Sequence, residues 1–438
     1  MFRRNKTKLR DDKITPDFVP MIRIVFWNSL GFFFFWFLIP YVSWQILGVS
    51  GTELGLAFAF QTFGGLLSSP LVGFLTDRVS KKLLVLIGSF GRGASYFVMY
   101  LGILIASLPI FTTGLFILGF FVGFFWSPLY ALMSEKSHKS YRSSAFGKQG
   151  GMLGKGNLVG SILSFIIFGL ANVFIPENRF IVYSPLILFT ASNIYAGIIF
   201  NRQVDEHLTY ENHIGGNSSL SEMKESDKKH IKSSQSNQKI SKFSFGFIIG
   251  FIVLITAFMT SNINQTIGPP FFQVYLIEEL KIDNAVIVML IYFPSQIFSL
   301  LLSPKMGKLA DKINPMIGMA IVSGFGSLIT WLIINSTNGI VFSIMLLLDS
   351  SFGWAGGLIL QNIISRISKG HRGKIFGISQ WMSFVGAIIG PIIGGFAWDY
   401  LGHKVPFIIS IFVEASLIPL YIIAIKKLKP YMAEQLDY

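Results

Sequence analysis

The sequence predicts an all-α membrane protein of twelve transmembrane helices, arranged as two pseudo-symmetric six-helix halves. Composition, a regular succession of apolar runs and an internal repeat support this prediction. Hydrophobic residues make up 52% of the 438-residue chain and charged residues only 13%, roughly half the charged share of an average soluble protein. A soluble fold cannot bury so much apolar surface, whereas lipid tails accept it without cost.

Twelve apolar runs have about the length of 20 residues that crosses a bilayer. They cover approximately residues 21–43, 54–75, 83–105, 110–133, 146–171, 180–200, 244–267, 286–304, 315–335, 339–363, 375–398 and 405–425. Residues 201–243 differ from the short turns elsewhere, because they are polar, with seven basic and six acidic residues. We therefore expect an N-terminal half (1–200), a cytoplasmic polar linker (201–243) and a C-terminal half (244–438).

The basic residues orient these spans. If both termini are cytoplasmic, the inner segments hold 31 of the 36 Lys and Arg residues and the outer loops hold three. This is the asymmetry that membrane insertion imposes, and a miscounted span would have scrambled it. The sequence thus predicts an integral protein of the cell (plasma) membrane, in contact with the lipid bilayer. The net charge of +14 does not indicate a nucleic-acid partner, because the basic residues form short clusters between spans.

Each half contains a copy of the same motifs. SPLVGFLTDR (69–78) and SPKMGKLADK (303–312) share S-P-x-x-G-x-L-x-D-[RK] at an offset of 234 residues. At an offset of 230, Arg142, Phe146, Gly147, Gly156 and Gly160 recur as Arg372, Phe376, Gly377, Gly386 and Gly390. Parallel six-helix repeats place a substrate site at the interface of the halves, where rocking exposes it to each side in turn.

With these motifs, the sequence resembles the major facilitator superfamily over nearly its whole length. GFLTDRVSKK (73–82) is similar to that family's loop 2–3 signature, G-x-L-a-D-R-x-G-R-K, although Ser80 replaces a glycine; GKLADK (307–312) is similar to its weaker second copy. The resemblance implies a gating motif made of Gly73, Asp77, Arg78, Lys81, Lys82, Gly307, Asp311 and Lys312. The glycine permits close helix approach, the aspartate can accept from a helix N-terminus, and the basic residues suit an anionic leaflet.

A glycine-rich segment in the eleventh span bears on the subfamily. GAIIGPIIGG (386–395) resembles the antiporter motif of proton-coupled drug exporters, but that motif belongs to helix 5. Helix 4 also lacks the arginine that such exporters often carry. We expect helix packing from this segment's Gly386, Gly390, Pro391, Gly394 and Gly395.

Four charged residues lie well inside spans: Arg92, Lys155, Asp349 and Glu414. A charge at the bilayer centre costs about 2.5–3.5 kcal/mol on insertion scales, so each requires an explanation. The resemblance implies that helices 1, 4, 7 and 10 line a central cavity and that 3, 6, 9 and 12 lie outside it. Asp349, on helix 10, is then the candidate for proton coupling or cation binding. The alternative is a bridging carboxylate satisfied by Ser350 and Ser351.

The other polar groups also have two interpretations each. Lys155, on helix 5, could bind an anionic substrate or reach back to the inner surface. Arg92 and Glu414 are expected to be structural ties on peripheral helices. Helices 1 and 7 carry uncharged candidates for substrate contact or interhelical hydrogen bonds, namely Asn28, Asn262, Asn264 and Gln265. The last three precede Gly268-Pro269-Pro270, where we expect helix 7 to be interrupted.

These features predict a secondary active transporter of a small molecule that works by alternating access. No phosphate-binding loop of the type G-x-x-x-x-G-K-[ST] is present, so protons, or sodium, are the expected energy source. The first hypothesis is export of amphipathic or drug-like compounds. The alternative is an uptake permease for a nutrient or organic anion, supported by Lys155 and Arg92; a transport-inactive membrane sensor is a remote third.

An enzyme is not expected. The chain has no Cys, and its six His residues lie in loops or at span ends, so no nucleophile–base pair or metal cluster is placed at membrane depth. We expect neither metal nor cofactor, and a monomer.

Overall fold

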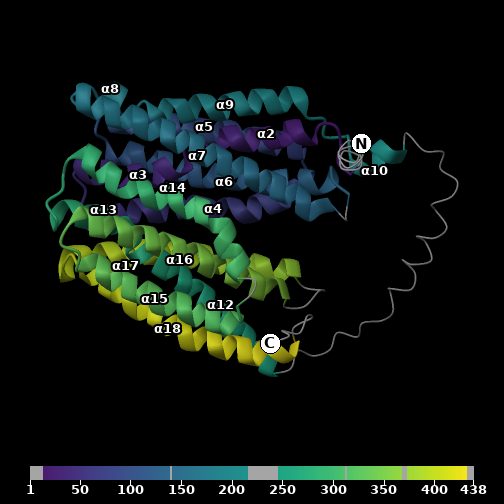
Figure 1. Cartoon of the computed structure of the whole chain (residues 1–438). Coiled ribbons are helices and arrows are strands. Elements are labelled where there is room, and N and C mark those ends of the chain that lie inside the picture. Colours follow the sequence, from purple (N-terminus) through teal and green to yellow (C-terminus); the bar gives the residue numbers. More distant parts are fainter. Residues whose placement is uncertain (1–12, 139–140, 216–244, 311–312, 367–371, 432–438) are drawn as a thin grey trace, which may run out of the picture.

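A computed structural model describes residues 13–138, 141–215, 245–310, 313–366 and 372–431. The described N-terminal half is helical (Figure 1). Its elements are α2 (Phe18–Asn28), α3 (Phe32–Gln45), α4 (Gly51–Thr76), α5 (Lys81–Leu104), α6 (Leu108–Glu135), α7 (Arg142–Phe174), α8 (Arg179–Val182), α9 (Pro185–Gln203) and α10 (Tyr210–Gly215). Most of the linker lies outside the described residues.

The C-terminal half repeats this helical sequence. Its elements are α12 (Phe245–Ile267), η2 (Pro269–Phe271), α13 (Phe272–Glu278), α14 (Ala285–Ala310), α15 (Pro315–Ile334), α16 (Gly339–Arg366), α17 (Arg372–Leu401), α18 (Val405–Leu428) and η3 (Lys429–Tyr431). Ten helices in the described part of the chain are long and apolar enough to cross a membrane. The expected sixth and eighth spans correspond to two further long helices, α9 and α14.

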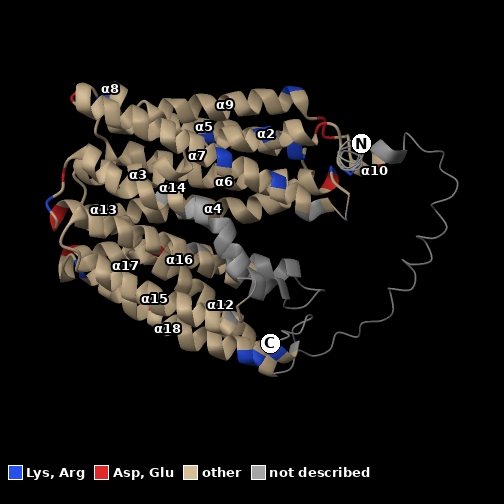
Figure 2. Ribbon diagram, viewed as in Figure 1, with Lys and Arg blue, Asp and Glu red and all other residues tan. Residues whose placement is uncertain are grey.

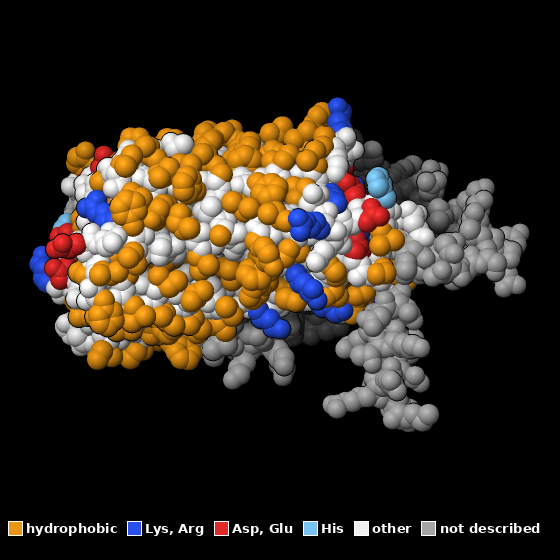
Figure 3. All heavy atoms as spheres, turned by 90° about the horizontal axis from the view of Figure 1, so that it is seen from above, with side chains coloured by type: hydrophobic (Ala, Val, Ile, Leu, Met, Phe, Trp, Pro, Cys, Tyr) orange, Lys and Arg blue, Asp and Glu red, His pale blue; other side chains and the backbone are white. Residues whose placement is uncertain are grey.

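The outer surface fits a bilayer. Large apolar side chains such as Phe74, Phe174 and Phe412 are exposed, and apolar groups are spread over most of the face that Figure 3 shows. Charged residues gather mainly at the two ends of the helices (Figure 2). Lipid-facing backbone must satisfy its own hydrogen bonds, and helices do so within each segment. The chain is therefore an integral membrane protein by its surface as well as by its sequence.

The helices pack as two bundles. Within the N-terminal half, α6 packs against α4 and α5, and α9 against α2 and α5; within the C-terminal half, α15 packs against α16 and α18, and α12 against α17 and α18. Across the halves, α4 packs against α17 and α7 against α14. The bundles lie together at one end and separate toward the end that carries both termini (Figure 1). We call these the far end and the termini end.

Repeated glycines create equivalent close contacts in both halves. A Cβ added to Gly156 or Gly160 of α7 would overlap the carbonyl oxygen of Phe26 or Leu30. In the C-terminal half, a Cβ on Gly386 of α17 would overlap the Met259 carbonyl oxygen, and one on Gly390 would lie 2.7 Å from that of Ile263. Only glycine permits backbones to approach so closely. The sequence repeat is thus a repeat of helix packing.

The first helix of each half is interrupted. Residues 29–31 separate α2 from α3, and Gly268 with η2 separates α12 from α13. The second break lies at the predicted Gly-Pro-Pro, because proline lacks the N–H that continues a helix. The first break has no proline and was not predicted from the sequence.

Hydrogen bonds join the halves at the far end. The carboxylate of Asp399 on α17 accepts from the backbone N–H groups of Gly51 and Thr52, each at 2.8 Å, and from the Thr52 hydroxyl at 2.6 Å. Trp44 Nε1 donates to Glu278 at 2.8 Å. Asp399 therefore caps the start of α4 from the opposite half, where a negative charge suits the helix dipole.

Candidate functional site

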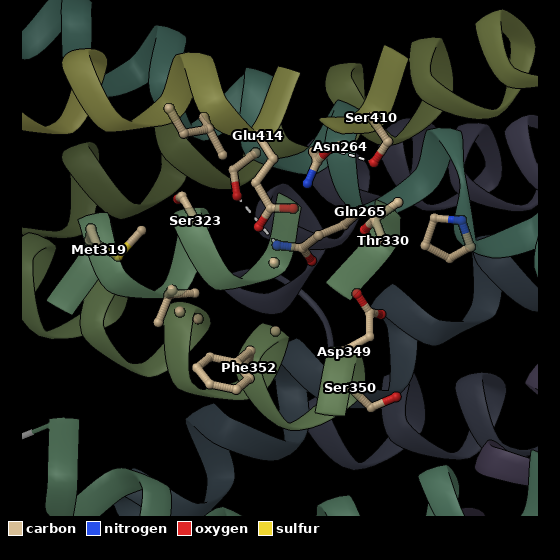
Figure 4. Close-up of a pocket in the computed structure, with 18 of the residues that line it drawn as sticks. Asn264, Gln265, Met319, Ser323, Thr330, Asp349, Ser350, Phe352, Ser410 and Glu414 are labelled. Carbon is tan, nitrogen blue, oxygen red and sulfur yellow. Dashed lines mark hydrogen bonds between the residues drawn. The ribbon is translucent and has the colours of Figure 1, made fainter. Parts of the chain in front are cut away.

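A cavity of about 530 Å³ opens among the helices of the C-terminal half. Residues of α12, α15, α16 and α18 form most of its walls, together with Phe272 of α13. The N-terminal half contributes Trp36 of α3. Figure 4 shows polar side chains reaching into it from all four helices. A volume of this size suits a drug-sized molecule.

Asp349, the candidate for proton coupling, lies in the wall of this cavity. Its carboxylate projects inward from α16 (Figure 4). The hydroxyl of Ser351, one of the bridging partners considered, donates instead to the Leu347 carbonyl oxygen at 2.8 Å. Within the described residues, Asp349 forms no hydrogen bond and no ion pair. The carboxylate is available to a solute.

Glu414 lines the same cavity, which corrects the expectation of a structural tie on a peripheral helix. The helix, α18, does pack on the outside of the bundle, but this side chain points inward (Figure 4). It lies over Gly326 of α15, where an added Cβ would overlap Glu414 Oε1. No basic side chain in the described part of the chain pairs with it. Because Gly326 has no side chain, an outer helix can reach the cavity.

The amides of α12 divide between cavity and packing. Asn264 and Gln265 line the cavity; Asn264 Oδ1 accepts from the Ser410 hydroxyl at 2.7 Å, and Gln265 Nε2 donates to Ser261 at 3.3 Å. Asn262 Nδ2 instead donates to Ser383 of α17 at 3.0 Å. Asn262 is therefore an interhelical tie, whereas the other two amides are placed to contact a solute.

Asn28 is not at the cavity, because Arg92 engages it in the core of the N-terminal half. Arg92 is 4% exposed and donates to the backbone carbonyl of Asn28 at 2.8 Å and to its side-chain oxygen at 3.3 Å. The accepting carbonyl is at the end of α2, where the helix break leaves it without a helical partner. Arg92 and Asn28 thus form a contact between α5 and α2 in the core, away from the cavity.

Lys155 is exposed on α7 and does not line the cavity. It has no described partner in a hydrogen bond or ion pair.

The gating motif is partly described. Asp77 follows α4 and is exposed, and its carboxylate forms no hydrogen bond or ion pair with another described residue. Arg78 lies over the Phe74 ring at 3.8 Å, Lys81 pairs with Glu135 at 3.1 Å, and Lys82 donates to the Asn201 carbonyl oxygen at 2.8 Å.

The sequence predicts a close helix–helix contact at the glycines of this motif. A Cβ added to Gly73 would meet nothing within 4 Å among the described residues, so the close approach expected there is not present in this conformation. Gly307 is inside α14, while Asp311 and Lys312 lie outside the described residues.

The glycine-rich segment of α17 packs as predicted. A Cβ on Gly394 would overlap the carbonyl oxygen of Ile267 at the break of helix 7, and one on Gly395 would overlap that of Gly51. The Pro391 carbonyl oxygen in turn lies against Gly55 of α4. This segment therefore joins α17 both to its own half and to the other.

Sequence and structure comparisons identify the family. The profile described as the Major Facilitator Superfamily matches residues 23–365. The chain belongs to the major facilitator superfamily. No curated protein sequence matches it.

Its fold is similar to the crystal structure of the nucleoside transporter NupG, with a TM-score of 0.65 and 12% identity over 94% of this chain and 100% of that one. An aspartate-to-alanine variant of NupG is similar at 0.65 and 13%, covering 93% and 99%. At such identity, the likeness concerns the fold.

Membership makes this major facilitator protein a transporter of small molecules. Two residues with cross-helix or cavity contacts in the structure were not predicted from the sequence to have them. Glu414 was expected to be a structural tie on a peripheral helix, and no role was expected of Asp399. A signal for Glu414 was present: an ionisable side chain in mid-span indicates a functional site by default.

Proposed function

We propose that the protein is a proton-coupled exporter of amphipathic, drug-like compounds, working by alternating access between its halves. One observation carries this proposal: two carboxylates, Asp349 and Glu414, face a single cavity and have no ion-pair partner among the described residues. A buried carboxylate can exchange a proton when its surroundings change. The aromatic walls suit an apolar body.

The packing of the halves supports alternating access. We propose that residues 1–200 and 244–438 rock as two units joined by the linker, with both termini in the cytoplasm of a cell whose plasma membrane holds the protein. The bonds of Asp399 and Trp44 close the far end, while the helices separate at the termini end (Figure 1). This arrangement corresponds to an inward-facing state. The exposed Asp77 then belongs to a gate that forms when the termini end closes.

We favour export over the alternative of an uptake permease for a nutrient or organic anion. That alternative depended on Lys155 and Arg92 as sites for an anion, and neither side chain lines the cavity. Similarity to a nucleoside transporter concerns the fold and does not extend to its substrate.

Reconstituted vesicles test the proposal. Purified protein in proteoliposomes with an imposed pH gradient should drive uphill movement of a panel of fluorescent amphipathic dyes. A protonophore should abolish that movement, whereas replacing sodium with potassium should leave it unchanged. Uphill movement that survives the protonophore would contradict proton coupling, and its dependence on sodium would identify the other ion. A chain that moves none of the compounds and no protons would support the sensor hypothesis.

A further inference from the structure

The internal repeat relates the two helices that hold Arg92 and Gly326. Helix α5 begins at Lys81 and α15 at Pro315, which is the offset of 234 shared by the loop motifs. At this offset the buried faces also agree: Ser89 and Ser323 are both buried, and Arg92 corresponds to Gly326. The N-terminal half therefore has an arginine where the C-terminal half has no side chain.

The last helix of each half is related in the same way. Both α9 and α18 have a proline among their first two residues, Pro185 and Pro406, at an offset of 221. Their buried residues repeat at this offset, as Phe189 and Ser410, Ala196 and Leu417, and Phe200 and Tyr421 show. Asn193 consequently corresponds to Glu414.

A third replacement removes an aromatic ring. Helices α6 and α16 have the same length and begin 231 residues apart. At this offset, Phe125, whose ring lies 5.3 Å from the Arg92 guanidinium carbon, corresponds to Gly356. Leu118 corresponds to Asp349. The C-terminal half thus has glycines at the positions of Arg92 and Phe125. It has carboxylates at the positions of Asn193 and Leu118.

These replacements indicate what the cavity accepts. In the N-terminal half, the guanidinium of Arg92 fills the space and donates to Asn28. In the C-terminal half, Gly326 and Gly356 contribute no side chain to the equivalent region, and the Glu414 carboxylate lies over Gly326. Both glycines line the cavity with Asp349 and Glu414. The N-terminal half therefore holds a cationic group, the Arg92 guanidinium, at the equivalent place, and its surroundings there are less negative.

We infer that the cavity binds organic cations, with a guanidinium or amine head group against Glu414 and Asp349 in the position that the Arg92 guanidinium occupies in the other half. The carboxylates supply the charge complement that a buried cation requires. Trp36, Phe272 and Phe352 provide aromatic surface for the rest of the molecule. This inference rests on the proposed export function and names its substrate class.

Binding of matched probes tests this inference separately from transport. Benzylguanidine, which is a cation, and benzylurea, which is its neutral isostere, would be titrated calorimetrically into the full-length protein in detergent, without a gradient. The cation should bind at least about tenfold more tightly, because hydrogen bonds to a charged partner are the stronger ones. In Glu414→Gln this preference should shrink markedly, whereas the control Glu135→Gln, at the termini end, should retain it.

A second variant moves the arginine into the C-terminal half. Gly326→Arg should abolish binding of benzylguanidine, and it should unfold at a higher temperature than Gly326→Met, because its guanidinium can pair with Glu414. In the Glu414→Gln background this difference should disappear.

The outcomes separate the two proposals. Equal affinity of wild-type protein for benzylguanidine and benzylurea would overturn the cation inference, even if Glu414→Gln failed to fold. Selective binding without proton-driven movement in vesicles would overturn the coupled export and leave the cation site standing.

Discussion

The two halves share one scaffold but differ at its centre. The N-terminal half is filled around Arg92, which ties α5 to the end of α2, whereas the C-terminal half encloses a cavity with two carboxylates. The glycine contacts that fix the helices are the same in both. Repeated residues thus maintain the architecture, and we propose that a few unlike residues at equivalent positions assign one half to packing and the other to solute binding. Four predictions test this division.

The largest effect is expected at Asp349, in the half assigned to the solute. Asp349→Asn keeps the volume but cannot release a proton, so uphill transport in proteoliposomes should fail while exchange of solute down its own gradient continues. The mutant should also lose the pH dependence of solute binding. If the carboxylate is only a bridge, all transport modes and the thermal stability will fall together instead.

Substitutions at the two repeated glycines are expected to cause equal losses of stability. Gly160→Val and Gly390→Val each force a side chain against a backbone carbonyl of the first helix in their half. Each should destabilise by about 1–3 kcal/mol or more, as overpacking does, measured as a lowered midpoint of thermal unfolding in detergent. Gly150→Val, where an added Cβ meets nothing within 4 Å, is the matched control. A large difference between the two glycines would show that the halves do not pack equivalently.

A packing role in the N-terminal half predicts a stability effect for Arg92. Arg92→Leu leaves the Asn28 carbonyl at the helix break without its donor, and an unsatisfied buried acceptor costs about 1–3 kcal/mol. Thermal unfolding should therefore report the loss. Affinity for benzylguanidine should be unchanged, since Arg92 is outside the cavity. A change in that affinity with normal stability would contradict the division between the halves.

The smallest effect is expected at the contact that joins the halves. Asp399→Asn removes the charge that caps α4, an interaction worth about 0.3–1 kcal/mol. Its loss should change the population of molecules with a closed far end by up to about a fewfold. Because the chain has no Cys, spin labels on the exposed residues Glu177→Cys and Lys404→Cys can report the distance between the two halves at the far end. In Asp399→Asn, the population with the longer distance between the two spin labels should increase. An unchanged distribution would mean that Asp399 is not needed to close the far end.

The sequence by itself determined the architecture. Apolar length, the placement of Lys and Arg, and the repeated S-P-x-x-G-x-L-x-D motif predicted the membrane helices and two related halves, because lipid allows few alternatives to a helix. It also predicted the helix 7 break and the cavity position of Asp349, since proline and intramembrane charge act locally.

Tertiary structure alone decided which polar groups meet. The side-chain direction of Glu414, the capture of Asn28 by Arg92 and the capping of α4 by Asp399 depend on contacts between segments far apart in the chain. Membrane helices are so uniformly apolar that periodicity says little about which face of a helix is buried in protein. The occupant of the space at Gly326 also depends on the neighbouring helices, because a glycine in the sequence does not reveal whether a side chain from elsewhere fills its place. Here a carboxylate lies over that glycine beside an open cavity, and for this reason we propose that the C-terminal half binds the solute.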